Sequence, residues 1–151
     1  MTERELSHVD ERGRVVMVDT SGKPIVARRA VAEAFFIAQS STLERVMDGD
    51  VPKGEALATA RIAGIQAAKL CDRLIPLCHS LPLDQVAVDF NRTAPDRIRI
   101  EAEVVVQART GVEMEALTAV TVAALTLYDM TKAVDRELRI EGIRLVHKEK
   151  G

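Results

Sequence analysis

The sequence has few aromatic residues: no tryptophan, one tyrosine and three phenylalanines among 151 residues. It also has no basic block, and its formal net charge is −2. Proteins that bind nucleic acids usually carry a basic surface, and many of them stack bases on aromatic side chains. The composition therefore argues against a nucleic-acid-binding protein.

Long hydrophobic runs are missing as well, since none approaches the roughly 20 residues that a helix needs to cross a bilayer. Residues 1–8 lack the apolar core of a signal peptide. Two cysteines, Cys71 and Cys78, are too few and too close in sequence for a disulfide framework. We expect a cytoplasmic protein with reduced thiols and no membrane partner.

Hydrophobic residues are plentiful, at 47% of the chain, and a chain of this length suits one domain with a substantial core. Residues 1–26 are polar, contain two glycines and a proline, and show no sustained hydrophobic period. We expect them to form a partly ordered N-terminal arm. Residues 27–151 then make up the single domain.

Residues 111–132 predict a central helix. Between Ala116 and Tyr128 this segment has no charged residue. An apolar helix of this kind is usually buried, so we expect protein to cover it on all sides, either its own sheet or a partner subunit.

Charged residues stand at both ends of this helix. Glu113 and Glu115 fall in the first turn, where carboxylates are favoured. Asp129 and Lys132 share a face near the other end, although such a pair alone is usually a plain ion pair. Glu115 and Asp129 are fourteen positions apart, or roughly 21 Å along a helix. A small pocket in one chain cannot use both, so either the ligand is extended or two chains combine their helices.

Apolar periodicity predicts helices over 41–47 and 55–69 and strands over 27–38, 83–90, 97–106 and 138–148. A helix over 27–38 would also fit the pattern. Residues 41–44, Ser-Thr-Leu-Glu, have the spacing of a capping box. Gly64 should allow close packing of the second helix, and Gly142 predicts a bulge or a bend in the last strand. The order of elements is that of the α+β ferredoxin-like fold, an antiparallel sheet covered on one face by helices.

Two further segments place reactive groups in tight surroundings. Lys53 precedes Gly54, which lets a backbone and an amine approach a ligand, although a solvated turn is the simpler interpretation. His79 lies in a stiff loop between two prolines, where it is either a functional imidazole or a satisfied core histidine. Cys78 beside it is interpreted as a packed thiol, because no neighbouring base is evident.

The runs 58–65, 74–79 and 111–120, followed by 128–130 and 132–134, closely resemble the molybdenum cofactor biosynthesis protein C family, the cyclic pyranopterin monophosphate synthases. The resemblance covers residues 17 to about 145. It implies a lyase that converts 3′,8-cyclo-7,8-dihydroguanosine 5′-triphosphate to cyclic pyranopterin monophosphate and releases diphosphate. It also implies a homohexamer, a trimer of dimers, with active sites at subunit interfaces.

The resemblance also implies roles for individual residues. The catalytic positions are Asp129, Lys132 and Lys53. The substrate-binding positions are Leu77, Cys78, His79, Glu113, Met114, Glu115 and Arg28. Asp129 is then the candidate general acid or base, the basic residues neutralise phosphate charge, and His79 shuttles a proton or binds phosphate. A magnesium ion can accompany the triphosphate, and no other cofactor and no metal site in the protein is expected.

Two other functions stay open as alternatives. A catalytically weak, nucleotide-binding ferredoxin-like module is suggested by a C-terminal tail shorter than is usual in the family. The other alternative is a small metal-binding protein that would use Cys71, Cys78 and His79. Metal analysis of the purified chain tests it, and we expect to find no stoichiometric transition metal.

Overall fold

A computed structural model describes residues 7–151, and residues 1–6 of the expected arm lie outside the described residues. The elements are, in order, β1 (Val26–Ile37), α1 (Ser40–Asp48), α2 (Ala56–Lys69), α3 (Cys71–Leu74), β2 (Gln85–Ala94), β3 (Arg97–Ala108), α4 (Glu113–Thr131) and β4 (Arg139–Lys150). Every predicted strand and helix is present within a few residues of its expected bounds. The short helix α3 was not predicted.

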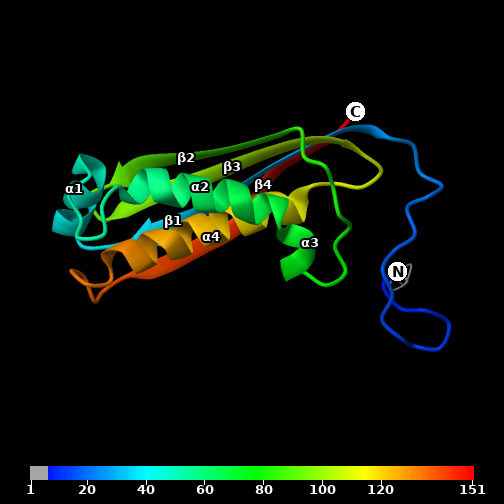
Figure 1. The fold of residues 1–151 in the computed structure, drawn as a ribbon, viewed down its shortest axis with the longest axis horizontal. Coiled ribbons are helices and arrows are strands. Elements are labelled where there is room, and N and C mark those ends of the chain that lie inside the picture. The colour runs from blue at the N-terminus through cyan, green and yellow to red at the C-terminus, as the bar shows by residue number, and fades with distance from the viewer. Residues whose placement is uncertain (1–6) are drawn as a thin grey trace.

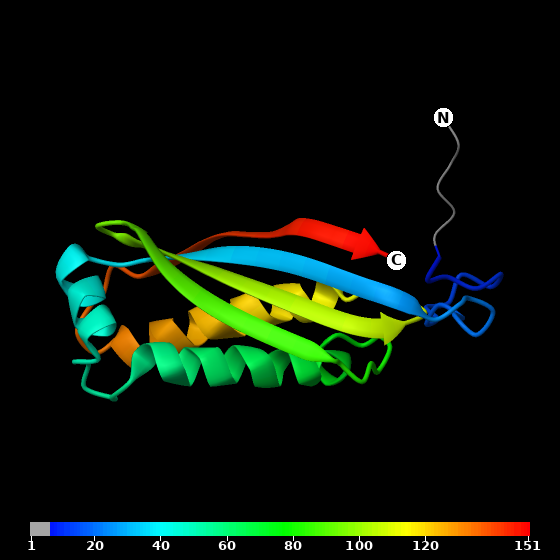
Figure 2. The ribbon, with the colours of Figure 1, turned by 90° about the horizontal axis from the view of Figure 1, so that it is seen from above.

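The strands form a four-stranded antiparallel sheet in the order β2-β3-β1-β4. Helices α2 and α4 lie side by side along one face of this sheet (Figures 1 and 2). The split β-α-β order of elements together with this layering is the predicted α+β, ferredoxin-like arrangement.

Strict alternation of side chains explains why the helices cover this face. On β1 and β3 every second residue points to the helices, and those side chains are at most 1% exposed: Ala30, Ala32, Ala34, Phe36, Ile98, Ile100, Ala102, Val104 and Val106. Helix α2 also approaches α4 closely at Gly64. A Cβ atom at Gly64 would stand 3.0 Å from the carbonyl oxygen of Ala119, which confirms the close packing predicted there.

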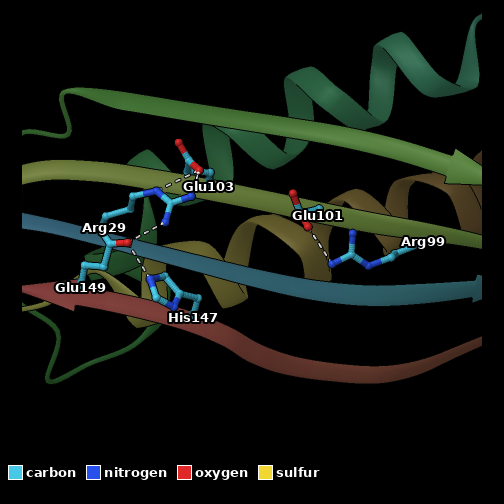
Figure 3. A network of polar contacts seen from close by, with 6 residues as sticks. All are labelled: Arg29, Arg99, Glu101, Glu103, His147 and Glu149. Atoms are coloured by element: carbon cyan, nitrogen blue, oxygen red, sulfur yellow. Dashed lines mark hydrogen bonds and ion pairs between the residues drawn. The ribbon is translucent and has the colours of Figure 1, made fainter.

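The opposite face of the sheet carries charged side chains (Figure 3). Glu33 is only 3% exposed on this face. Its two carboxylate oxygens each accept a hydrogen bond of 2.6 Å, one from Nε of Arg99 and one from Nε of Arg144. The net effect on the pKa of the Glu33 carboxyl is a decrease. Burial alone would raise it, but the hydrogen bonds and positive charges of the two arginines outweigh burial. Arg29 and Glu103 make a similar pair nearby.

The predicted capping box at residues 41–44 is wrong. Helix α1 already begins at Ser40, and Gln39 at its N-cap makes no side-chain capping hydrogen bond. Instead the backbone N–H of Gln39 donates to the carboxylate of Asp135, at 2.9 Å. A carboxylate from the turn after α4 thus satisfies a free amide at this end of α1.

The central helix is covered only in part. The side of α4 that faces the sheet and α2 is fully buried, at Ala116, Ala119, Val120, Ala123, Ala124 and Leu127. Leu125 on the other side is 53% exposed. The expectation that protein covers this helix on all sides is therefore not met within one chain.

Strand β4 contains the predicted bulge. Gly142 has a φ of +60°, and the register of β4 against β1 shifts between Glu33 and Phe35. Glycine adopts this left-handed conformation without the strain that a Cβ atom would cause. Among the described residues, no helix combines the length and the apolar character needed to cross a membrane.

Candidate active site

Lys53, Asp129 and Lys132 lie together, and the pairing of Asp129 with Lys132 was expected from their spacing. The Nζ atom of Lys53 lies 2.8 Å from one carboxylate oxygen of Asp129, and the Nζ atom of Lys132 lies 2.8 Å from the other. Asp129 belongs to the last turn of α4, and Lys132 follows that helix directly. Lys53 comes from the turn before α2, where Gly54 has a φ of +97°. We call these three residues the lysine–aspartate cluster.

The lysine–aspartate cluster is open to solvent, with side chains that are 46% to 56% exposed. Hydrogen bonds from Lys132 and Lys53 lower the pKa of Asp129 to about 2. The same pairing raises the pKa of Lys132. Asp129 is therefore an ionised carboxylate between two ammonium groups near neutral pH. A carboxyl with this pKa is poorly matched to proton transfer at neutral pH, so the geometry favours Asp129 as the group that positions the two lysines.

A cavity of about 330 Å³ lies at the other end of α4. It is lined by the six substrate-binding residues expected from the two motifs, namely Leu77, Cys78, His79, Glu113, Met114 and Glu115. The first three come from the loop after α3 and the last three from the first turn of α4. We call this the helix-start cavity.

Glu115 is the most perturbed acid in the helix-start cavity. The residue is 4% exposed, and this burial raises the pKa of its carboxyl to about 7. The carboxylates of Glu113 and Asp72 add to the rise. A carboxyl with a pKa near 7 can both donate and accept a proton near neutral pH.

The thiols beside this cavity are held protonated. Burial raises the pKa of Cys71 to about 12 and also raises that of Cys78. The sulfur of Cys71 lies 3.5 Å from the hydroxyl oxygen of Thr118. Because the thiolate is the reactive form, neither cysteine is suited to act as a nucleophile. Among residues 7–151, no three His, Cys, Asp or Glu side chains are grouped in a way that could hold a metal ion.

The two groups of residues lie at opposite ends of α4, with α1 near one end and α3 near the other (Figure 1). Helix α4 is continuous from Glu113 to Thr131. The rise of an α-helix therefore separates Glu115 from Asp129 by roughly 21 Å. The predicted catalytic residues and the predicted substrate-binding residues therefore do not share a pocket within one chain. This separation agrees with the spacing of Glu115 and Asp129 in the sequence.

The chain matches the sequence model of the MoaC family over residues 17–151. It belongs to the MoaC family. A cyclic pyranopterin monophosphate synthase of Roseiflexus sp. (strain RS-1) is 55% identical over 148 residues, which cover 97% of this chain and 94% of that protein. Cyclic pyranopterin monophosphate synthase 1 of Mycobacterium tuberculosis (strain ATCC 25618 / H37Rv) is 54% identical over 146 residues, which cover 97% and 86%. The synthase of Chloroflexus aggregans is 51% identical over 148 residues, which cover 97% and 90%.

In this member of the MoaC family, Arg28 joins neither group. Its Nη2 atom donates a hydrogen bond of 3.2 Å to the carbonyl of Arg109. Its Nε atom is buried and has no hydrogen-bond partner among the described residues. Arg28 lines a separate hollow together with Glu149 and Lys150. An unpaired buried donor is costly, and an anionic group would satisfy it.

The helix-start cavity is also lined by residues of the N-terminal arm. The sequence did not identify these residues as part of the site. They are Ser7, His8, Val18, Thr20 and Lys23. The carbonyl of Val18 lies 2.7 Å from Nε2 of His79, and the carbonyl of Lys23 accepts a hydrogen bond of 3.2 Å from Nε of Arg109. The resemblance to the family begins at residue 17, within the arm. This start was the one signal in the sequence that could have identified arm residues as part of the site.

Proposed function

We propose that this chain is a cyclic pyranopterin monophosphate synthase of molybdenum cofactor biosynthesis. Its substrate would be 3′,8-cyclo-7,8-dihydroguanosine 5′-triphosphate, and its products cyclic pyranopterin monophosphate and diphosphate. The relatives named above carry the synthase name and match nearly the whole chain. The structural observation that carries the proposal is the lysine–aspartate cluster, because two ammonium groups held beside one carboxylate suit a polyphosphate.

The lysine–aspartate cluster would serve the phosphate chemistry. Closing the cyclic phosphate requires a sugar hydroxyl to attack the α-phosphorus, so that one P–O bond forms while the bond to diphosphate breaks. Negative charge grows on the leaving diphosphate in this step. Lys53 and Lys132 can stabilise that charge, and Asp129 keeps both ammonium groups in place before the substrate binds.

Proton transfers would fall to the helix-start cavity. Opening the purine ring and rebuilding it as a pyranopterin requires groups that accept and release protons. Glu115, whose pKa burial raises to about 7, fits this task better than Asp129, whose pKa the two lysines lower to about 2. We therefore assign the acid–base role to the cavity and the charge-neutralising role to the cluster.

A complete site would then need two copies of the chain. The two groups are roughly 21 Å apart on one helix, and an antiparallel pair of α4 helices would bring one copy's cluster to the other copy's cavity. The helical face also exposes apolar side chains, with Ile62 at 59%, Leu125 at 53% and Tyr128 at 39%. These features support the dimer, and the family resemblance implies that three such dimers form a homohexamer.

The activity is tested by adding the cyclic dihydroguanosine triphosphate to the purified protein and following diphosphate and the pterin product. We expect both to appear, and Lys53→Ala and Asp129→Asn each to lower turnover at least about 100-fold. Lys69→Ala, at an exposed lysine that ends α2, is the matched control and should keep wild-type turnover. Repeating the assay with a chelator tests whether Mg²⁺ accompanies the triphosphate. Binding without release of either product would favour the nucleotide-binding module instead.

Mixing two inactive variants tests whether the site spans two copies. Asp129→Asn and Glu115→Gln chains are coexpressed with different tags, and the mixed assemblies are purified. In a shared site, random mixing leaves about a quarter of the sites with both groups intact, so about a quarter of the activity returns. If each chain builds its own site, every site keeps one defect and the mixture stays inactive.

A further inference from the structure

The hydrogen bond of His79 fixes where its ring protons lie. Nε2 of the imidazole stands 2.7 Å from the carbonyl oxygen of Val18. A carbonyl oxygen can only accept a hydrogen bond, so Nε2 must carry a proton. A neutral imidazole has a single N–H group, and its other nitrogen, Nδ1, is then a bare acceptor.

The Nδ1 atom of His79 has no hydrogen-bond partner among the described residues and is not fully buried. Among the described residues, the only buried side-chain nitrogen or oxygen atom without a hydrogen-bond partner is Nε of Arg28. The ring of His79 makes its hydrogen bond through Nε2, so Nδ1 is not a buried atom. His79 also lines the helix-start cavity together with Glu113 and Glu115. The ring also lines two neighbouring hollows, and a ligand that reaches Nδ1 from any of these spaces meets a free lone pair.

The arm that carries Val18 has a second contact with the domain. Further along the same arm, the carbonyl of Lys23 accepts a hydrogen bond from Nε of Arg109, the residue that follows β3. The carbonyl of Arg109 in turn accepts a hydrogen bond from Arg28 of β1. Between these points Asp19 closes a local turn by accepting the backbone N–H of Ser21 at 2.9 Å. Besides the bond between Val18 and His79, the arm is thus tied to the domain at Lys23, five residues further along the chain.

We propose that Val18 is a positioning residue: its carbonyl holds His79 in the Nε2–H tautomer, so that Nδ1 accepts a proton from the substrate in the helix-start cavity. The proposal rests on the proposed function, in which the purine ring must lose protons as it opens. The proton moves from a substrate N–H or O–H group to Nδ1 and gives an imidazolium. The Nε2–H of this cation still donates to the Val18 carbonyl, and a hydrogen bond from a charged donor is stronger than one from a neutral donor.

The tautomer can be measured without any activity assay. The full-length protein is labelled with ¹⁵N-histidine, and long-range ¹H–¹⁵N spectra distinguish the two neutral forms. The chain has three histidines, and a His79→Gln sample assigns the signal of interest. We expect the Nε2–H form for neutral His79. A Nδ1–H form would overturn the proposal, whatever the protein catalyses.

Two substitutions separate the arm contact from the proton transfer. In His79→Gln the side-chain amide can still donate from the Nε2 position to Val18 but has no basic nitrogen, whereas the shorter amide of His79→Asn cannot reach that carbonyl. We expect the Gln variant to keep the arm protected from limited proteolysis and the Asn variant to lose that protection. Equal loss of protection in both variants would refute the contact.

The kinetic outcome is equally specific. We expect kcat of His79→Gln to fall about 10² to 10⁴-fold with little change in KM, and the acidic limb of its pH–rate profile to change. A Gln variant with wild-type kcat and an unchanged profile would refute the role of Nδ1. His147→Gln is the matched control, because His147 pairs with Glu149 on the opposite face of the sheet and should not affect turnover (Figure 3).

Discussion

Glu115 should make the stability of this protein depend on pH. The pKa of its carboxyl rises from the ordinary 4.5 to about 7 in the folded chain, chiefly because the residue is buried. Below pH 4.5 the group is protonated in both the folded and the unfolded state. As the pH rises from there to about 7, the unfolded chain loses this proton and the folded chain keeps it. The free energy of unfolding therefore falls over this range and levels off above it.

The size of the effect follows from the two pKa values. They differ by about 2.5, and at about 1.4 kcal/mol per pH unit the loss amounts to about 3 kcal/mol. Glutamine at position 115 is neutral at every pH, so Glu115→Gln should not show this loss. The stability of the variant relative to the wild type should rise by about 3 kcal/mol between pH 4.5 and pH 8.

Urea unfolding followed by circular dichroism, at several pH values in this range, measures the difference directly. Other groups titrate equally in both proteins and cancel in the comparison. Glu44→Gln, at an exposed glutamate of α1, is the matched control and should run parallel to the wild type. A constant difference between Glu115→Gln and the wild type across the range would refute the reasoning, because it would mean that burial does not keep this carboxyl protonated.

Two further predictions concern the sheet. Glu33→Gln should lower the free energy of unfolding by about 1 to 3 kcal/mol, since it weakens two charged hydrogen bonds to a buried carboxylate. Glu141→Gln, at a more exposed ion pair of the same face, should cost less than about 1 kcal/mol, and equal losses in urea unfolding would contradict this. Gly142→Ala should cost at least about 1 to 2 kcal/mol, because its φ is +60° and its Cβ atom would stand 2.9 Å from the ring of Phe35. Gly22→Ala, with open space around it, should leave the thermal midpoint unchanged, and a neutral Gly142→Ala would show that the bulge relaxes.

The strands and long helices were predictable because their signal is local. The alternation of β3 is complete over its helix-facing residues, and β3 forms a strand whose buried and half-buried side chains follow that alternation. Two other features could not be predicted, because neither leaves a local pattern in the sequence. Helix α3 has four residues, which is too short for a hydrophobic period. The amide of Gln39 at the start of α1 is satisfied by Asp135, 96 residues away, and a local capping pattern cannot reveal such a contact.

The sequence predicted charged residues at both ends of α4, but it could not predict their pKa values. The resemblance pointed to Asp129 and Glu115 alike, and the sequence favoured Asp129 as the acid or base. The pKa of each carboxyl depends on neighbours that only the fold brings near. Lys53, which lowers the pKa of Asp129, lies 76 residues away in the chain. Glu115 is buried by packing and has the opposite shift, so the tertiary structure favours Glu115 for proton transfer.

In the proposed function, the length of α4 connects assembly with catalysis. A continuous helix is stiff, so no rotamer change can bring groups roughly 21 Å apart on it to one reacting atom. The same helix leaves Leu125, near the middle of its length, 53% exposed. If a second copy covers that apolar side in antiparallel orientation, the contact that buries Leu125 is also the contact that completes two sites at once. A lone chain would carry both halves of the machinery and no complete site, and activity would rise with the concentration of the assembled form.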